Sequence, residues 1–246
     1  MKVYDEIMAT LKNDRIHMTL IDPASQDASR AALIAREADQ AGTDYFMIGG
    51  STEIDGKSMD CTISEIKKVT DKKIIIFPGS SSMVSTKADA IYFMTLLNSR
   101  NPEFIIKHQV KAAPLLKSIN METISMGYLI FKPGMTVGRI GEANLLDEAN
   151  IEEITSYAMA AEMFGLKLLY LEAGSGSPNH IMPETVRRVR ASVKIPIIVG
   201  GGIRSPEASR EIAQAGADII VTGTVAEKSS NIETVLGSII RSMKRS

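Results

Sequence analysis

Short apolar runs rich in β-branched residues alternate with stretches of helical periodicity from one end of the chain to the other. The apolar runs are continuous rather than alternating, which indicates strands buried on both faces, as in a parallel sheet covered by helices. We predict strands at residues 16–22, 44–50, 73–79, 90–97, 123–131, 166–173, 195–201 and 218–223. We predict helices at residues 26–41, 61–71, 102–118, 150–164, 183–193, 205–215 and 231–244, and none in the serine-rich segment 80–88.

Helix start and stop signals agree with this register. Pro206 directly after Ser205 is typical of a capped helix start, and Gly216, like Gly42 and Gly165, is placed to end a helix in a left-handed conformation. The repeated strand–helix units predict an α/β fold of the TIM (β/α)8 barrel type, with a single domain over residues 1–246. An open doubly wound sheet is disfavoured, because no GxGxxG follows the first strand.

Composition and charge exclude several classes of protein. The 246 residues are 44% hydrophobic and carry a net charge of −1, with 28 basic residues dispersed among 29 acidic ones, so no nucleic acid partner is expected. Cys61 is the single cysteine, which fits a reducing, cytoplasmic location. The charged N-terminus does not resemble a signal peptide, no apolar run approaches a membrane span, and we find no basic amphipathic helix that would form a stable membrane anchor.

Glycines follow three of the late apolar runs, in the segments 168–176, 195–203 and 217–224. Glycine at a strand end lets backbone N–H groups approach a ligand, and a following helix N-terminus favours negative charge. In barrels of this type a phosphate binds between the loops after strands seven and eight. We therefore predict a phosphate cradle that includes Gly201, Gly202, Gly223 and Thr224, although tight turns alone would also require glycines.

Two carboxylates end predicted strands at the same rim. Asp22 ends the first strand and is expected to face the barrel mouth opposite the cradle, where it either holds Mg²⁺ beside Ser51 or caps a helix or turn. Glu172 has the side-chain parity of Tyr170, so both should point the same way. Glu172 is a candidate general base, or else a partner in a salt bridge inside the barrel.

Other candidates are less distinct. Apolar residues around Met83, Ile91 and Phe93 would either line a groove for a hydrophobic ligand or belong to the core. Lys132 is either a point charge for a diphosphate or a solvated loop lysine. His17, His108 and His180 lack the mutual spacing of metal ligands and are interpreted as structural or surface residues.

Five motifs together resemble the geranylgeranylglyceryl phosphate synthase family of archaea, which is related to bacterial heptaprenylglyceryl phosphate synthases. They are LIDP at 20–23, IGGS at 48–51, YLEAGSG at 170–176, VGGGI at 199–203 and VTGT at 221–224. Members of that family are TIM barrels that join a polyprenyl diphosphate to sn-glycerol 1-phosphate. YLEAGSG is the specific motif, because other phosphate-binding barrels share the GGG and GT ends.

The resemblance implies roles for individual residues. Asp22 and Ser51 match positions that hold Mg²⁺. The positions that match the family's glycerol 1-phosphate site are Tyr170, Leu171, Glu172, Ala173, Gly174, Ser175, Gly176, Gly201, Gly202, Gly223 and Thr224. On this reading Mg²⁺ neutralises the leaving diphosphate, while Glu172 takes the proton from the attacking C3 hydroxyl. The resemblance also implies a homo-oligomer, either dimer or hexamer, and a lipid donor implies transient contact with a membrane.

Three functions thus remain after the sequence: the prenyltransferase, with either a geranylgeranyl or a heptaprenyl donor; a sugar-phosphate isomerase or aldolase; and a non-catalytic phosphate-binding barrel. An aldolase that forms a Schiff base needs a buried lysine within a strand, whereas Lys107, Lys132 and Lys167 fall at or outside the predicted strand ends. The chain also lacks a DDxxD pair, so synthesis of the prenyl donor itself is not expected.

Overall fold

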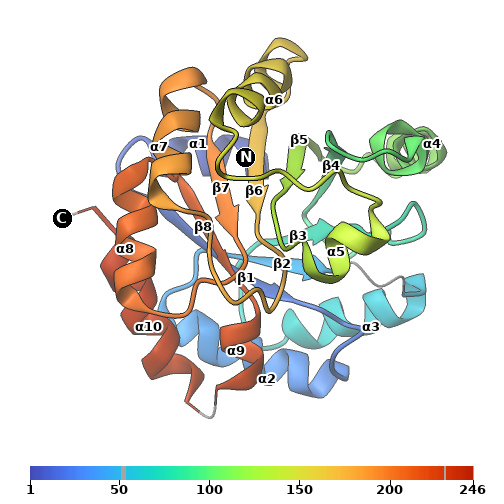
Figure 1. Ribbon diagram of the computed structural model, residues 1–246. Helices are drawn as coiled ribbons and strands as arrows, with labels where there is room; N and C mark the ends of the chain where they lie inside the picture. The colour runs from blue at the N-terminus through green and yellow to red at the C-terminus, as the bar shows by residue number, and fades with distance from the viewer. Residues whose placement is uncertain (51–53, 230, 246) are drawn as a thin grey trace.

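The computed structural model of the 246-residue chain describes all residues except 51–53, 230 and 246. Eight parallel strands close into a barrel in chain order, β1 beside β2 and so on until β8 pairs with β1 (Figure 1). The predicted TIM barrel is thereby confirmed. The strands are β1 (Ile16–Ile21), β2 (Tyr45–Gly49), β3 (Ile74–Phe77), β4 (Ala90–Leu96), β5 (Thr123–Ile130), β6 (Leu168–Glu172), β7 (Ile197–Gly200) and β8 (Ile219–Thr222).

Helices surround the barrel and cover its outer face (Figure 1). They are α1 (Val3–Leu11), α2 (Ala28–Ala41), α3 (Gly56–Ile66), the π-helical turn η1 (Glu103–Lys107) that leads into α4 (His108–Ser118), α5 (Met135–Ile140), α6 (Ile151–Met163), α7 (Pro183–Ser192), α8 (Pro206–Ala215), α9 (Thr224–Lys228) and α10 (Ile232–Met243). Within the described residues, no helix combines the length and the apolar character that crossing a bilayer requires.

Several helices differ from the sequence prediction. The helix predicted at 61–71 begins earlier, because the Asp55 side chain accepts a hydrogen bond from the Ser58 N–H and caps α3. Helices α1, α5 and α9 were not predicted. α1 buries Val3 and Ile7 against the barrel interior, and the Glu122 carboxylate accepts the Val3 and Tyr4 N–H groups at 2.7 and 2.9 Å. This cap depends on a residue far away in the sequence, so local patterns do not reveal it.

The predicted cap signals are confirmed in α8. The Ser205 side chain accepts a hydrogen bond from the Ala208 N–H, Pro206 occupies the first turn, and Gly216 ends the helix with φ of 117°. A correctly bounded α8 fixes the direction in which the chain leaves β7, and therefore where the glycines after β7 lie.

An aromatic layer fills the barrel near its C-terminal end. Phe77, Tyr128 and Tyr170 come from β3, β5 and β6, and their ring centroids lie 5.1 to 5.9 Å apart. Tyr92 from β4 packs edge-on against Phe77 at 6.3 Å. Such edge-to-face contacts stabilise a layer beyond its burial of apolar surface. The layer fills the barrel interior directly beneath the rim that the C-terminal strand ends form.

A buried polar network lies on the outer side of β1 and β8. His17 is fully buried, and its ring nitrogens contact the hydroxyl oxygens of Thr43 at 2.9 Å and Thr222 at 3.0 Å. Burial, together with the positive charge of Lys244, lowers the His17 pKa from 6.5 to about 3. His17 is therefore an uncharged structural residue at neutral pH, as the sequence interpretation held.

Replacing His17 with Gln is expected to change how the stability depends on pH. Because the folded-state pKa is depressed, the contribution of neutral His17 is fully present above pH 6.5 and is lost as the pH falls toward 3. Below pH 6.5 the parent should lose up to ~1.4 kcal/mol per pH unit more than His17→Gln. Chemical denaturation at several pH values measures the difference, and parallel pH profiles for the two proteins would contradict it.

Candidate active site

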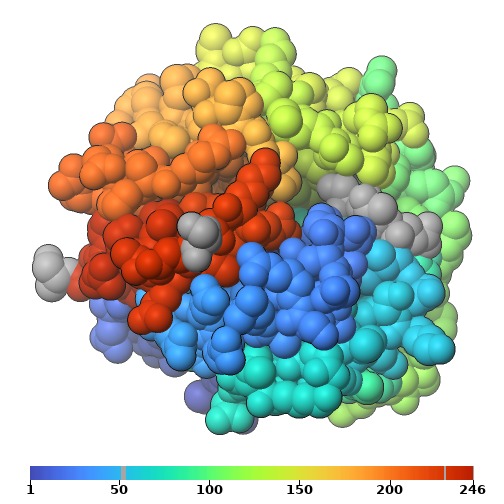
Figure 2. Space-filling model, turned by 90° about the horizontal axis from the view of Figure 1, so that it is seen from below, coloured from blue at the N-terminus to red at the C-terminus, as the bar shows by residue number. Residues whose placement is uncertain are grey.

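Two cavities of different character open at the rim formed by the C-terminal strand ends. A polar cavity of about 410 Å³ lies over the ends of β6, β7 and β8. An apolar cavity of about 760 Å³ lies between β3, β4 and β5 on one side and η1, α4 and α5 on the other. Figure 2 views the molecule from this end, where the late residues of α9 lie beside the early residues that follow β1.

The polar cavity gathers all four residues predicted to form the phosphate cradle, together with three more of the expected glycerol 1-phosphate site. Its lining includes Tyr170, Glu172, Ser175, Gly201, Gly202, Gly223 and Thr224. The hydroxyl groups of Ser175 and Thr224 lie 3.1 Å apart and connect the loop after β6 with the start of α9. Leu171 and Ala173 instead pack their side chains into the layer between barrel and helices, so only their backbone is available to the cavity. Gly174 and Gly176 continue the same loop.

Glu172 lines the polar cavity. The carboxylate is buried, accepts the Gly174 N–H at 2.6 Å, and accepts hydrogen bonds from the hydroxyl groups of Tyr170 and Tyr128. Tyr170 and Glu172 point the same way, as their parity predicted. Burial raises the pKa of Glu172, while these hydrogen bonds oppose the rise. No ion pair involves Glu172 among the described residues, so the salt-bridge interpretation is not supported.

Gly201 approaches Glu172 so closely that no other residue fits. It has φ of +83°, and a Cβ placed there would lie 2.6 Å from Glu172 Oε1 and 2.7 Å from the Gly174 nitrogen. Both distances are shorter than any normal contact of a Cβ. The glycine after β7 is therefore required for the shape of the cavity and not only for a turn.

Arg204 lines the same cavity, and sequence reasoning did not single it out. Its guanidinium donates hydrogen bonds to the carbonyl oxygens of Pro178, at 3.1 Å, and of Ser177. Arg204 therefore ties the loop after β7 to the loop after β6 and places a permanent positive charge beside the glycines. The available signal was a lone basic residue directly after GGGI.

Asp22 lies at the end of β1, where its carboxylate faces Gly50 and does not line the polar cavity that holds the cradle. Barrel closure pairs β1 with β8, so Asp22 neighbours α9, and its N–H donates to the carboxylate of Glu227. Burial raises the pKa of Asp22, and burial together with the charge of Asp22 raises that of Glu227. Glu227 was missed because it lies five residues beyond β8, in a helix too short to be predicted. Ser51, the other predicted Mg²⁺ ligand, lies outside the described residues.

The surroundings of Asp22 fit a hard cation. Its Oδ1 accepts the Ala24 N–H at 2.9 Å, and Oδ2 faces Gly50, where a Cβ would come within 2.5 Å. Gly50 thus leaves room for the carboxylate beside the mouth of the apolar cavity, which it also lines. Mg²⁺ is characteristically held by one or two carboxylates together with phosphate oxygens. A cation here would also relieve the repulsion between Asp22 and Glu227.

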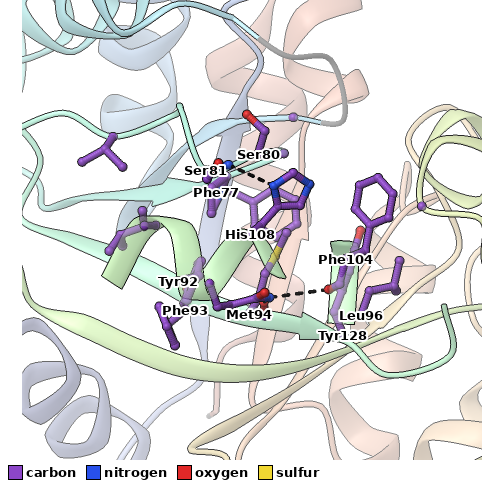
Figure 3. Close-up of a pocket in the computed structure, with 18 of the residues that line it drawn as sticks. Phe77, Ser80, Ser81, Tyr92, Phe93, Met94, Leu96, Phe104, His108 and Tyr128 are labelled. Carbon is purple, nitrogen blue, oxygen red and sulfur yellow. Dashed lines mark hydrogen bonds between the residues drawn. The ribbon is translucent and has the colours of Figure 1, made fainter. Parts of the chain in front are cut away.

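The apolar cavity coincides with part of the predicted hydrophobic groove. Ile91 and Phe93 line it, together with Tyr92, Met94 and Leu116, whereas Met83 is buried in the core outside it. Figure 3 shows Phe104 and His108 extending from η1 and α4 toward Phe77 and the residues of β4. The lining of the apolar cavity is almost wholly apolar apart from Ser80, Ser81, His108 and Gln109. The cavity is suited to a hydrocarbon chain.

His108 and Lys132 have surroundings that the sequence could not provide. His108 accepts the Ser81 N–H at 3.4 Å and packs edge-on against Phe104, so it is part of the cavity wall (Figure 3). Lys132 forms an exposed ion pair with Asp147 at 2.7 Å, which favours the interpretation as a solvated loop lysine. His180 bonds the carbonyl of Ile181. No three His, Cys, Asp or Glu residues in the described part of the chain form a metal cluster.

The aromatic layer separates the two cavities. Tyr128 lines the apolar cavity and Tyr170 the polar one, with ring centroids 5.1 Å apart, and both hydroxyl groups donate to Glu172. A polar ligand over the glycines and an apolar ligand over β4 would therefore meet near one carboxylate. This arrangement can join two substrates of opposite character.

Known proteins resemble this chain along its whole length. The sequence model of the PcrB family matches residues 8–243. Geranylgeranylglyceryl phosphate synthase of Thermoplasma volcanium is 54% identical over 244 residues, which cover 99% of this chain and 97% of that protein. The synthase of the same name from Picrophilus torridus is 55% identical over 243 residues, covering 99% of this chain and 100% of that protein.

A solved structure is similar in fold and in sequence. It is (S)-3-O-geranylgeranylglyceryl phosphate synthase from Thermoplasma acidophilum in complex with its substrate sn-glycerol-1-phosphate. The TM-score is 0.96 at 53% identity, covering 99% of this chain and 98% of that chain. The predicted family resemblance is thereby confirmed.

Gly201→Ala is expected to weaken binding of inorganic phosphate at least about ten-fold, because the added methyl group displaces Glu172 and the Gly174 N–H. The matched control is Gly165→Ala, since Gly165 also has positive φ, at +74°, but nothing lies within 4 Å of its Cβ position. The control should lose about 1 kcal/mol of stability and keep its phosphate affinity. Isothermal titration calorimetry measures both, and equal phosphate affinities in the two variants would contradict the role of Gly201.

Proposed function

This chain belongs to the PcrB family, and on that premise we propose that it is a prenyltransferase that joins geranylgeranyl diphosphate to the C3 hydroxyl of sn-glycerol 1-phosphate. The product would carry the first ether bond of archaeal membrane lipids. Relatives that share more than half of its residues bear the name of this synthase, and the similar solved structure holds sn-glycerol-1-phosphate.

The observation that carries the proposal is the position of Glu172 between the two cavities. Its carboxylate lies among the glycines of the polar cavity and is bonded to Tyr128, which lines the apolar one. Glycerol phosphate over Gly201, Gly202, Gly223 and Thr224 would present its free hydroxyl to this carboxylate. A prenyl chain in the apolar cavity would then bring its allylic carbon toward the same point.

The proposed reaction needs one proton acceptor and no covalent intermediate. The C3 oxygen of glycerol phosphate bonds to C1 of the prenyl group, the allylic C–O bond breaks, and diphosphate leaves with the bonding electrons. Glu172 accepts the hydroxyl proton. Its raised pKa makes it a stronger base than an exposed glutamate, and the hydroxyl groups of Tyr128 and Tyr170 hold it in one orientation.

The diphosphate is proposed to bind near Asp22 with Mg²⁺, and Ser51 is the second proposed ligand. When bound, Mg²⁺ would supply positive charge for the leaving diphosphate. Asp22 contributes one oxygen at the rim, and Gly50 keeps the space beside it free. Glu227 lies close enough to Asp22 to modulate the charge there.

The three lysines considered for a competing Schiff-base aldolase do not meet its requirement for a buried amine. Lys107 and Lys132 form exposed ion pairs with Glu103 and Asp147, and Lys167 lies over the ring of Tyr4, 4.4 Å from the centroid. None of these three lysines is in the barrel interior, where a Schiff base would need a desolvated amine.

The assembly and location of the protein are further parts of the proposal. We propose a homo-oligomer, a dimer or hexamer, because Met163 and Phe164 at the end of α6 are 84% and 75% exposed. The exposed Cys61 supports a reducing cytoplasm. We also propose transient contact with a membrane during uptake of the lipid donor.

The proposed function is tested with Mg²⁺, labelled sn-glycerol 1-phosphate and geranylgeranyl diphosphate, and an ether-linked product is expected. Glu172→Gln should lower kcat by about 10²- to 10⁴-fold, because the amide cannot accept the proton. It should bind glycerol phosphate with similar affinity, since it retains an oxygen for the Gly174 N–H. Absence of product with any prenyl donor from C15 to C35 would refute the function, and unchanged turnover in Glu172→Gln would refute the base.

The pH dependence of activity and of stability gives a second test of the role of Glu172. Because burial raises the Glu172 pKa, kcat/KM of the parent should fall as the pH drops, starting above the ordinary glutamate value of 4.5. The folding stability depends on pH with the opposite sign to kcat/KM. A raised pKa contributes stability below pH 4.5 that is lost as the pH rises through the folded-state pKa. Glu172→Gln should therefore gain stability relative to the parent at pH 8 but not at pH 4, as measured by thermal unfolding.

A larger side chain in the apolar cavity is expected to shorten the preferred donor. Ala112 is the smallest side chain that α4 presents to the cavity, so Ala112→Phe fills space that a long prenyl chain would occupy. The ratio of kcat/KM for geranylgeranyl to farnesyl diphosphate should fall by about ten-fold or more. Ala113→Phe is the matched control, because Ala113 is exposed. An unchanged ratio in Ala112→Phe would place the prenyl chain elsewhere.

A further inference from the structure

The outer face of the segment 103–118 exposes apolar side chains in a row. Ile106 is 52% exposed and Val110 is 62% exposed, and both lie four residues apart, on the same side of the helix. Ala113 and Pro114 continue the row one turn further and are also exposed. These four apolar residues on an outward face are not needed for packing within one chain.

The segment is peripheral to the helical ring. α4 packs mainly on β4 and on η1, whereas α10 packs extensively on both α2 and α8. Figure 1 shows α4 at the outer edge of the molecule, away from the barrel axis. Its inner face nevertheless lines the apolar cavity through Ala112 and Leu116. One helix thus forms the wall between the apolar cavity and solvent.

Positive charge flanks the apolar row. Lys107, Lys111 and Lys117 are all exposed, and Glu103 is the only acidic residue between 103 and 118. Glu103 pairs with Lys107 at 3.2 Å and with Lys111 at 3.1 Å. Because one glutamate faces three lysines, the segment still carries an excess of positive charge. This excess is local, because the chain as a whole carries −1. Exposed apolar side chains beside lysines suit contact with an anionic bilayer, because the apolar groups can enter the headgroup boundary while the lysines meet lipid phosphates.

We propose that the outer face of η1 and α4 docks on an anionic bilayer, with Ile106 and Val110 entering the headgroup region and the three lysines contacting lipid phosphates. The inference rests on the proposed function, because a lipid diphosphate donor is what makes a bilayer the partner of this face. α4 carries apolar residues on both its inner and its outer face, so it is not a basic amphipathic anchor of the kind that the sequence analysis sought. The proposed docking is therefore a transient contact.

The test measures flotation of the full-length protein with vesicles, without substrate. The parent should bind vesicles of 30% phosphatidylglycerol in phosphatidylcholine and lose most of that binding on pure phosphatidylcholine or at high salt. Val110→Glu should reduce binding to the anionic vesicles about ten-fold. The matched control is Val69→Glu, the same substitution at a valine that is 36% exposed in the turn after α3, and it should bind as the parent does.

A second variant guards against a folding defect. Val110→Trp should bind the anionic vesicles more tightly than the parent, because tryptophan favours the interface. Both Val110 variants should retain parental activity on detergent-dispersed donor, since Val110 does not line the apolar cavity. With donor embedded in anionic vesicles, Val110→Glu should be slower than the parent.

Three results would overturn the inference. They are equal vesicle binding by Val110→Glu and the parent, loss of binding in Val69→Glu alone, and a smaller oligomer in Val110→Glu when the parent does not bind vesicles. The last would identify the face as a contact between copies of the chain. Failure of the proposed function has a different signature, namely no product from detergent-dispersed donor, a readout on which vesicle flotation does not depend.

Discussion

Burial of the Glu172 carboxylate is the constraint on which the rest of the site depends. An ionised carboxylate loses its hydration inside a barrel, at a cost of several kcal/mol, unless hydrogen-bond donors replace the lost water. The Gly174 N–H and the hydroxyl groups of Tyr128 and Tyr170 supply those donors. The requirement explains the glycine after β7, since a side chain at Gly201 would occupy the space of the carboxylate and of the Gly174 N–H.

Barrel closure then decides which strand ends become neighbours. Pairing of β8 with β1 brings Glu227 to Asp22, although more than 200 residues separate them in the chain. Parallel strands with their C-terminal ends at one rim also place the polar cavity and the apolar cavity side by side. The aromatic layer of Phe77, Tyr92, Tyr128 and Tyr170 keeps the two apart while letting both reach Glu172. A soluble phosphate ester in the polar cavity and a lipid in the apolar cavity would thus meet at one shared residue, Glu172.

The helices around the barrel make more contacts with one another on the side of the polar cavity than on the side of the apolar cavity. On the side of the polar cavity, α10 packs tightly against both α8 and α2. On the side of the apolar cavity, α4 packs mainly on β4 and its own π-helical turn. Such turns are common at functional sites. The half with more helix–helix contacts holds the polar cavity, and the half with fewer holds the apolar cavity.

The sequence by itself determined the fold and the polar half of the site. Continuous apolar strands, capped helices and glycines after β7 and β8 are local signals, because each depends on residues close together in the chain. It did not reveal α1, whose cap comes from Glu122, nor the roles of Arg204, Glu227 and His108, nor the extent of the apolar cavity. These depend on contacts between segments far apart in sequence. Which apolar residues face a cavity, the core or solvent is decided only when the barrel closes and the helices take their places around it.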